Sequence, residues 1–106
     1  MDKLNVQSNK RFVVIYDPIK GIPTPDGLAG VVVEGYINSS KNYTIVTSTS
    51  LVVDCFRLAV SDGRIQHDDI VFFHKDIEVT ISERGLIESA PVGFCDLHER
   101  YIMQLL

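Results

Sequence analysis

The chain has 106 residues, 45% of them apolar, which suits one small domain with a modest core. Its formal net charge is -4 and it has no basic run longer than Lys10-Arg11, so nucleic acid and anionic membranes are disfavoured as main partners. Its apolar runs are too short for a membrane span of about 20 residues, and the polar start lacks a signal-peptide core, which together predict a cytoplasmic protein. Residues 1–10 are predicted to form a flexible tail and residues 11–106 a single α/β domain.

The first predicted strand covers residues 11–16. Its four consecutive apolar residues, Phe12-Val13-Val14-Ile15, are typical of a strand covered on both faces. Pro18 ends the pairing because proline has no N–H to donate. Asp17 therefore follows the carboxyl end of a buried strand, which is where ligands bind in open α/β sheets.

Residues 17–27 contain three prolines and two glycines and predict an irregular loop. This loop is long for a strand-to-helix connection, which is typically about 2 to 6 residues. A helix is predicted from Asp26, its N-cap, to a stop at residues 38–42. Its apolar stripe is formed by Leu28, Val31, Val32, Gly35 and Tyr36. Because glycine costs about 1 kcal/mol against alanine in a helix, Gly35 predicts a close contact with the sheet.

A β-branched strand over 43–47 and a second helix, capped by Ser50, come next. The apolar side of this helix is formed by Val52, Val53, Phe56, Ala59 and Val60. The roughly opposite side is polar, with Asp54, Arg57 and Ser61. Gly63 is predicted to end the helix in the left-handed conformation.

The remaining chain predicts a change of pattern. Residues 69–73 and 77–81 are apolar strands separated by the charged turn 74–76, which is typical of an antiparallel hairpin. A second turn with Gly85 at positive φ leads into a short strand over 86–88. A terminal helix is predicted to place Leu97, Tyr101 and Leu105 on one face. The expected fold is α/β, a βαβα core with a mixed sheet, a C-terminal β-hairpin and a terminal helix.

Five short segments, in this order and at this spacing, resemble the C-terminal half of an ABC-type (SMC-like) predicted prokaryotic ATPase with a short β-rich C-terminal extension. The segments are Ile15-Tyr16-Asp17-Pro18, Gly21-Ile22-Pro23-Thr24-Pro25, Thr47-Ser48-Thr49, Arg57-Leu58-Ala59-Val60-Ser61-Asp62-Gly63 and Ala90-Pro91-Val92-Gly93-Phe94-Cys95-Asp96. The resemblance covers residues 11–106 and implies a degenerate fragment of such an ATPase.

The departures from the family pattern lie at its active residues. The resemblance places Tyr16 where the family has a Mg²⁺-binding carboxylate, Asp17 at the catalytic glutamate and Ser48 at the switch histidine. The sequence also contains no Gly-x-x-x-x-Gly-Lys-Ser/Thr phosphate loop and no Ser-Gly-Gly type signature. Phosphoryl transfer depends on these parts, so we expect no hydrolysis, no cofactor and no metal site. The residual ATPase-like positions are Tyr16, Asp17, Pro18, Thr47 and Ser48.

Three other groups have a functional and a structural interpretation. Asp17 is either a residual acid or metal site, or an Asx-turn residue that accepts hydrogen bonds from neighbouring N–H groups, and the second interpretation is favoured. For His67-Asp68-Asp69 a solvated turn is favoured over a metal cluster, because adjacent strand residues point to opposite faces. For Cys55 and Cys95, reduced thiols with a packing role are favoured over a metal site, a disulfide or a nucleophile with His98 as its base.

The resemblance also predicts an interaction surface. In an intact ATPase the strand 11–16 would be flanked by strands from the N-terminal half, so its edge must be covered here by a second copy, by another protein or by the C-terminal hairpin. The candidate contacts are Tyr16, Ile22, Pro23 and Pro25. The predicted function is a non-enzymatic interaction or modulator protein, acting as a homodimer or on a full-length ATPase relative. The alternative is a weak nucleotide-binding protein or enzyme with a residual site near Asp17 and Ser48.

Overall fold

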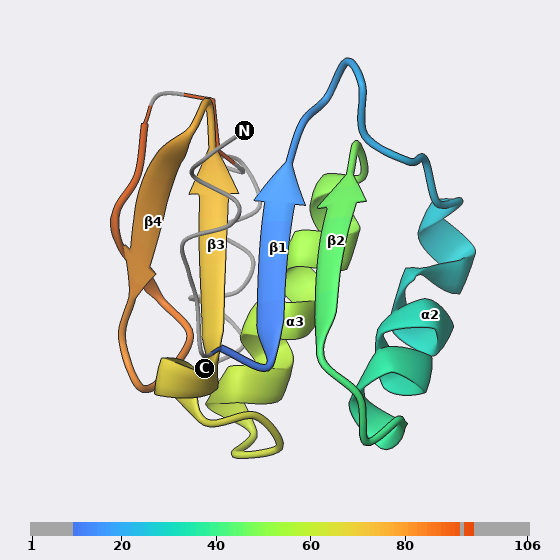
Figure 1. Cartoon of the computed structure of the whole chain (residues 1–106), viewed down its shortest axis with the longest axis vertical. Coiled ribbons are helices and arrows are strands. Elements are labelled where there is room, and N and C mark those ends of the chain that lie inside the picture. The colour runs from blue at the N-terminus through green and yellow to red at the C-terminus, as the bar shows by residue number, and fades with distance from the viewer. Residues whose placement is uncertain (1–9, 92, 95–106) are drawn as a thin grey trace.

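A computed structural model of the chain describes residues 10–91 and 93–94, which form a mixed five-stranded sheet and two α-helices (Figure 1). The elements are β1 (Phe12–Tyr16), α2 (Asp26–Asn38), β2 (Tyr43–Thr47), α3 (Ser50–Ser61), the 3-10 helix η1 (His67–Asp69), β3 (Ile70–His74), β4 (Ile77–Ile81) and β5 (Ile87–Ser89). The strand order is β2-β1-β3-β4-β5. The predicted α/β fold with a mixed sheet and a hairpin is confirmed, while the predicted terminal helix lies outside the described residues.

The central strand is flanked on both edges by parallel partners. Tyr16, the last residue of β1, pairs with Thr47 of β2 on one side and with His74 of β3 on the other. The three arrows in Figure 1 accordingly point the same way and end at the same level. Of the three expected ways to cover the edge of β1, the fold uses the C-terminal hairpin, whose strand β3 takes that place. On the other side of β1, the edge strand of the described sheet is β2.

The core lies on one face of the sheet. Alternation places Phe12 and Val14 of β1 on this face, and α3 packs across it behind β1 (Figure 1). The Phe12 and Phe56 rings lie 5.4 Å apart, which joins the first strand to this helix. The predicted apolar side of α3 is confirmed, because each of its five residues is buried: Val52, Val53, Phe56, Ala59 and Val60.

Helix α2 presents a different side to the core from the one predicted. Its core-facing residues are Ala29, Val33 and Tyr36. Of the predicted stripe, Tyr36 does pack against the core, whereas Leu28 and Val31 are 51% and 69% exposed, so the prediction is wrong at these two residues. The predicted close contact at Gly35 is also wrong, because an added Cβ would meet nothing within 4 Å. The reason is that this helix carries apolar residues on two sides, and the periodicity fits either of them.

The ends of the helices also differ from the predictions. The predicted caps, Asp26 and Ser50, are instead the first helical residues, and the residues before them make no side-chain cap hydrogen bond. The C-terminus of α2 is capped from outside by Arg11, whose Nη2 donates to the carbonyl of Ile37 at 2.7 Å and also to that of Ser39. A cation at this position favours the helix because the terminal carbonyls carry partial negative charge. Arg11 thereby ties the start of β1 to the end of α2.

The predicted polar side of α3 is covered rather than solvated. Arg57 is fully buried and Asp54 is 3% exposed, and their side chains form an ion pair of 3.3 Å. The Nε of Arg57 donates to the carbonyl of Gly85 at 2.8 Å, so the turn before β5 folds over this side of the helix. The burial of both charged residues follows from this turn, which the helical pattern could not reveal.

The hairpin and turns are close to the predictions. Lys75 and Asp76 connect β3 to β4 with φ values of 55° and 62°, as the two-residue turn of a twisted hairpin requires. His74 belongs to β3 and not to the turn. Gly85 and Gly63 have the predicted positive φ values, 79° and 80°. The last strand, β5, begins one residue later than predicted.

Substitution of Gly85 tests the contact between this turn and α3. An added Cβ would lie 2.3 Å from the carbonyl oxygen of Arg57, so Gly85→Ala combines left-handed strain with a backbone clash. We expect it to lower the free energy of unfolding by about 2 to 4 kcal/mol in urea denaturation. The matched control is Gly63→Ala, which has the same φ but open space, and should cost about 1 kcal/mol. Equal losses would contradict the predicted contact.

Candidate functional site

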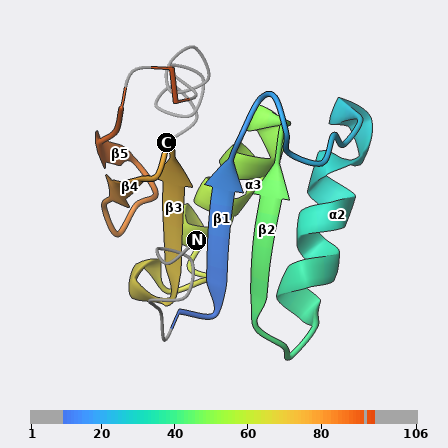
Figure 2. The ribbon, with the colours of Figure 1, turned by 45° about the horizontal axis from the view of Figure 1, so that its top comes forward.

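The carboxyl ends of β2, β1 and β3 lie side by side at one edge of the sheet (Figure 2). A polar residue follows each strand there: Ser48 after β2, Asp17 after β1 and Lys75 after β3. The Asp17 N–H donates to the carbonyl of Thr47 at 2.9 Å, which joins two of the ends directly. The fold therefore brings together the residues that the resemblance singled out, namely Tyr16, Asp17, Pro18, Thr47 and Ser48.

The carboxylate of Asp17 organises the loop that follows it. Its Oδ1 accepts hydrogen bonds from the N–H groups of Lys20 at 2.9 Å and Ile19 at 3.0 Å. These bonds, that from Lys20 first, hold the pKa of Asp17 below its ordinary value, and the charges of Lys20 and His74 act in the same direction. The Gly21 N–H donates to the carbonyl of Asp17 at 2.9 Å. This is the geometry of an Asx-type turn.

The middle of the loop is anchored on the outer edge of β2. Ile22 donates its N–H to the carbonyl of Val46 at 2.9 Å and accepts from the N–H of Ser48 at 3.2 Å, which forms an isolated parallel bridge. Two residues later the Thr24 N–H donates to Oγ1 of Thr49 at 2.7 Å, and this hydroxyl donates back to the Thr24 carbonyl at 3.0 Å. The loop is therefore fixed to β2 and to the start of α3.

This anchoring uses the main-chain N–H groups of the loop inside the fold. Each N–H from residue 19 to residue 24 donates to a partner within the chain, and Pro23 has none to offer. Gly21 lies so close to β2 that an added Cβ would be 2.3 Å from the carbonyl carbon of Thr47. Phosphate-binding loops present converging N–H groups to their ligand. In this described segment those groups are already bonded.

The two residues at the end of β2 are also enclosed by the loop. Thr47 is 2% exposed, and its Oγ1 accepts from the N–H of Thr49 at 3.0 Å and lies 3.4 Å from the carbonyl of Ile22. Ser48 is partly buried beneath the same loop. Its main-chain N–H donates to Ile22, as described above. These hydroxyl-bearing residues therefore help to hold the loop.

His74 is a buried residue at this edge that the sequence analysis did not single out. It is 3% exposed, and its Nδ1 lies 2.9 Å from the carbonyl of Tyr16. Because a carbonyl only accepts, the N–H at Nδ1 is the donor in this hydrogen bond. The rings of Tyr16 and Phe94 lie 5.2 and 5.9 Å from the imidazole. Strand alternation from Phe72 would have placed His74 on the inner face.

A hollow of about 270 Å³ opens at the ends of β1 and β3. Its lining includes both charged and apolar side chains, contributed by Ile15, Tyr16, Asp17, Pro18, Ile19, His74, Lys75 and Asp76. Ligand pockets usually have volumes of about 300 to 1,000 Å³, so this hollow is small for a nucleotide. Of the two acids that line it, Asp17 already accepts the hydrogen bonds of its own turn, and Asp76 belongs to the turn between β3 and β4.

The other candidate groups have structural surroundings. Among the described residues no three His, Cys, Asp or Glu side chains are placed to hold a metal ion. His67, Asp68 and Asp69 form η1, a short surface helix. Cys55 is half-buried, and burial followed by the charge of Asp54 raises the pKa of its thiol, which favours the unreactive protonated form. Cys95 lies outside the described residues.

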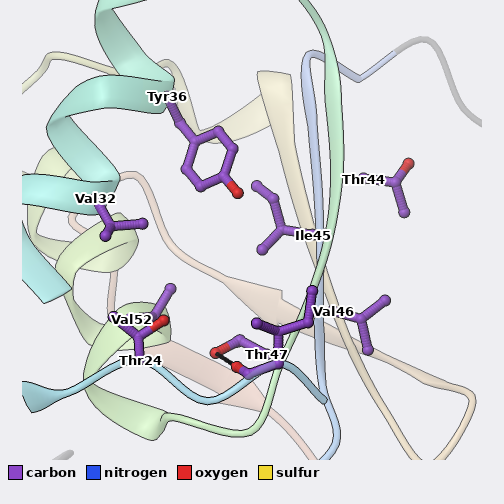
Figure 3. Close-up of a pocket in the computed structure, with 9 residues that line it drawn as sticks. Thr24, Val32, Tyr36, Thr44, Ile45, Val46, Thr47 and Val52 are labelled. Carbon is purple, nitrogen blue, oxygen red and sulfur yellow. Dashed lines mark hydrogen bonds between the residues drawn. The ribbon is translucent and has the colours of Figure 1, made fainter. Parts of the chain in front are cut away.

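A second, smaller hollow of about 100 Å³ lies between α2 and β2 (Figure 3). Val32 and Tyr36 of α2 form one side of it, while Ile45 and Val52 reach it from β2 and α3. Figure 3 shows the Thr44 and Val46 side chains pointing away from Tyr36, to the other side of β2. Their main chain therefore lies at the margin of the hollow. The remaining lining residues are Ile22, Thr24 and Thr47.

No protein-family model matches this chain, and neither a curated protein nor a solved structure matches it. The similarity to ABC-type ATPases therefore remains a hypothesis that depends on five short segments. In the part of the chain that the structure describes, neither α-helix has the length and apolar character needed to cross a membrane.

The lowered pKa of Asp17 predicts how its contribution to stability depends on pH. A carboxylate whose pKa is lowered on folding stabilises the fold above its ordinary value of 3.8, and this stabilisation is lost as the pH falls through the folded value. We expect Asp17→Ala to be less stable than the wild type at neutral pH, with the difference shrinking in acid. Asp17→Asn, which keeps an acceptor but does not titrate, is the control. A difference that is constant with pH in chemical denaturation would contradict this role.

Proposed function

We propose that the chain is a non-enzymatic interaction protein that binds another polypeptide through β2, the loop 19–25 and α2. The observation that carries this proposal is that Ile22 has a fixed main chain but an exposed side chain. Both its main-chain N–H and its carbonyl are hydrogen-bonded to the β2 segment, yet the residue is 69% exposed. Because the main chain that carries this apolar side chain is already fixed, binding requires little further ordering of the backbone, which suits an anchor residue at an interface.

The surroundings of Ile22 fit the same function. Leu28 and Val31, on the outer side of α2, are two further large apolar residues that are exposed. Pro23 and Pro25 are exposed as well and stiffen the loop between Ile22 and the helix. Tyr16, the fourth candidate contact, packs on His74 and Phe94, so the proposed surface omits it.

The hydrogen bonding of the loop is the reason that the proposal includes no nucleotide binding or hydrolysis. Its N–H groups are bonded within the fold, and the sequence contains no phosphate loop. In this view the chain is a degenerate ATPase-like fragment that keeps part of an ATPase fold without its chemistry. A full-length ATPase relative and a second copy of the chain are then its two candidate protein partners.

An Ile22→Asp variant tests the proposed surface. It places a charge on the anchor without disturbing a buried group, so the fold should persist while the affinity for the partner falls at least about tenfold. The measurement is capture from the source cytosol with identification by mass, together with light scattering of the purified chain. The matched control is Ile77→Asp at an isoleucine of β4 that is 52% exposed. Binding or self-association that both variants retain would contradict the proposal.

A titration with Mg-ATP separates this proposal from the alternative of a weak nucleotide-binding protein. No saturable binding is expected, because the loop offers the phosphates no N–H groups that are not already bonded. Calorimetry with the wild type is the measurement. Saturable binding at micromolar concentration that Asp17→Ala or Ser48→Ala removes would favour the alternative and overturn the interaction proposal.

A further inference from the structure

The outer edge of β2 has main-chain groups that no strand pairs. In its parallel pairing with β1, the main chain of Tyr43 and Thr47 faces β1, since Tyr43 donates to Arg11 and Thr47 accepts from Asp17. The main chain of the alternate residues, Thr44 and Val46, therefore faces outward. Of these outward groups, the carbonyl of Val46 is used by Ile22. Within the described residues, the N–H and carbonyl of Thr44 and the N–H of Val46 have no backbone partner.

The chain itself shows what this edge can bind. Ile22 lies along it as an extended residue, parallel to β2, and makes two main-chain hydrogen bonds. The next position along the same edge offers the same alternation of N–H and carbonyl groups. Such a row is complementary to the backbone of another extended polypeptide, which is the usual basis of strand addition.

A site for a side chain lies directly beside the unpaired groups. The hollow between α2 and β2 is about 100 Å³ and has apolar walls formed by Val32, Tyr36, Ile45 and Val52 (Figure 3). A cavity of about 150 Å³ holds benzene, so this hollow has the size of one aliphatic side chain. Main-chain groups and an adjacent apolar hollow are the two parts of a strand-addition site, the first for affinity and the second for specificity.

We infer that the partner is an extended peptide segment that adds as a short strand to β2 at Thr44 and places one aliphatic side chain in the hollow beside Tyr36. This inference rests on the proposed interaction function and names the chemistry of the partner. A slender peptide fits better than a second folded copy. Helix α2 stands alongside β2 in Figures 1 and 2, and a second copy paired through the same edge would bring its own α2 to this place.

The test uses the full chain and a phage-displayed library of random peptides, and the selected peptides are then synthesised and measured by fluorescence anisotropy. Thr44→Pro removes the outward N–H and leaves the pairing with β1 intact, because proline is tolerated on an edge strand at such a position. Thr44→Val keeps the N–H and is its control. Val32→Phe fills the hollow, and Val31→Phe, at the exposed neighbour, is the second control. We expect each of the first variants to weaken binding at least about tenfold, and the controls to change it less than about twofold.

A series of modified peptides keeps the test decisive if the Thr44→Pro chain does not fold. Selected peptides are N-methylated at one residue at a time and titrated into the wild-type chain. Loss of binding at alternate positions supports strand addition, because alternate N–H groups of an added strand face the sheet. Equal binding by every N-methylated peptide overturns it.

The outcomes also separate this inference from the proposed function. In one outcome, the selected peptides lose binding to Ile22→Asp, but their binding is unchanged by Thr44→Pro, by Val32→Phe and by N-methylation. This result overturns strand addition and still supports the interaction function. A dimer that Thr44→Pro dissociates, with no selected peptides, overturns the peptide in favour of a second copy. A monomer that captures neither peptide nor protein overturns both.

Discussion

The parallel pairing of β1 on both of its edges is the constraint on which the remaining structure depends. Because β2 and β3 match β1 residue for residue, the three strands end together, and Asp17 and Ser48 come to lie at one edge. The same pairing makes β2 the outer strand on its side, since β3 already takes the other edge of β1. The position of the loop, the hollow beside α2 and the unpaired groups at Thr44 all follow from this order of strands.

The strands and the apolar side of α3 could be predicted because their signals are local. The apolar run from Phe12 to Ile15 indicates a buried strand, and the spacing of Val52, Phe56 and Val60 indicates one apolar side of a helix. The side of α2 could not be predicted, since Leu28 and Val31 compete with Ala29 and Val33 for the core. The burial of Arg57 was also beyond prediction, because its partner at Gly85 is distant in sequence.

The candidate site was predictable in its grouping but not in its chemistry. The resemblance grouped Asp17 with Ser48, and the fold does bring them to one edge. The sequence could not show the path of residues 19–24. Along this path their N–H groups donate hydrogen bonds to Asp17, Val46 and Thr49. Hydrogen bonds of this kind depend on where a proline-rich loop settles against a neighbouring strand, and no local pattern records that.

One cause underlies both halves of the functional argument. When the loop bonds to β2, its N–H groups are used inside the fold and its next apolar side chain, Ile22, is turned outward and held there. The bonding of the loop N–H groups within the fold and the exposure of Ile22 on a fixed main chain thus both follow from the same contact with β2. Because Ile22 covers only one end of the edge, the main-chain N–H and carbonyl of Thr44 have no backbone partner among the described residues. In the proposed function, this arrangement suits recognition of a polypeptide better than recognition of a phosphate at this edge of the sheet.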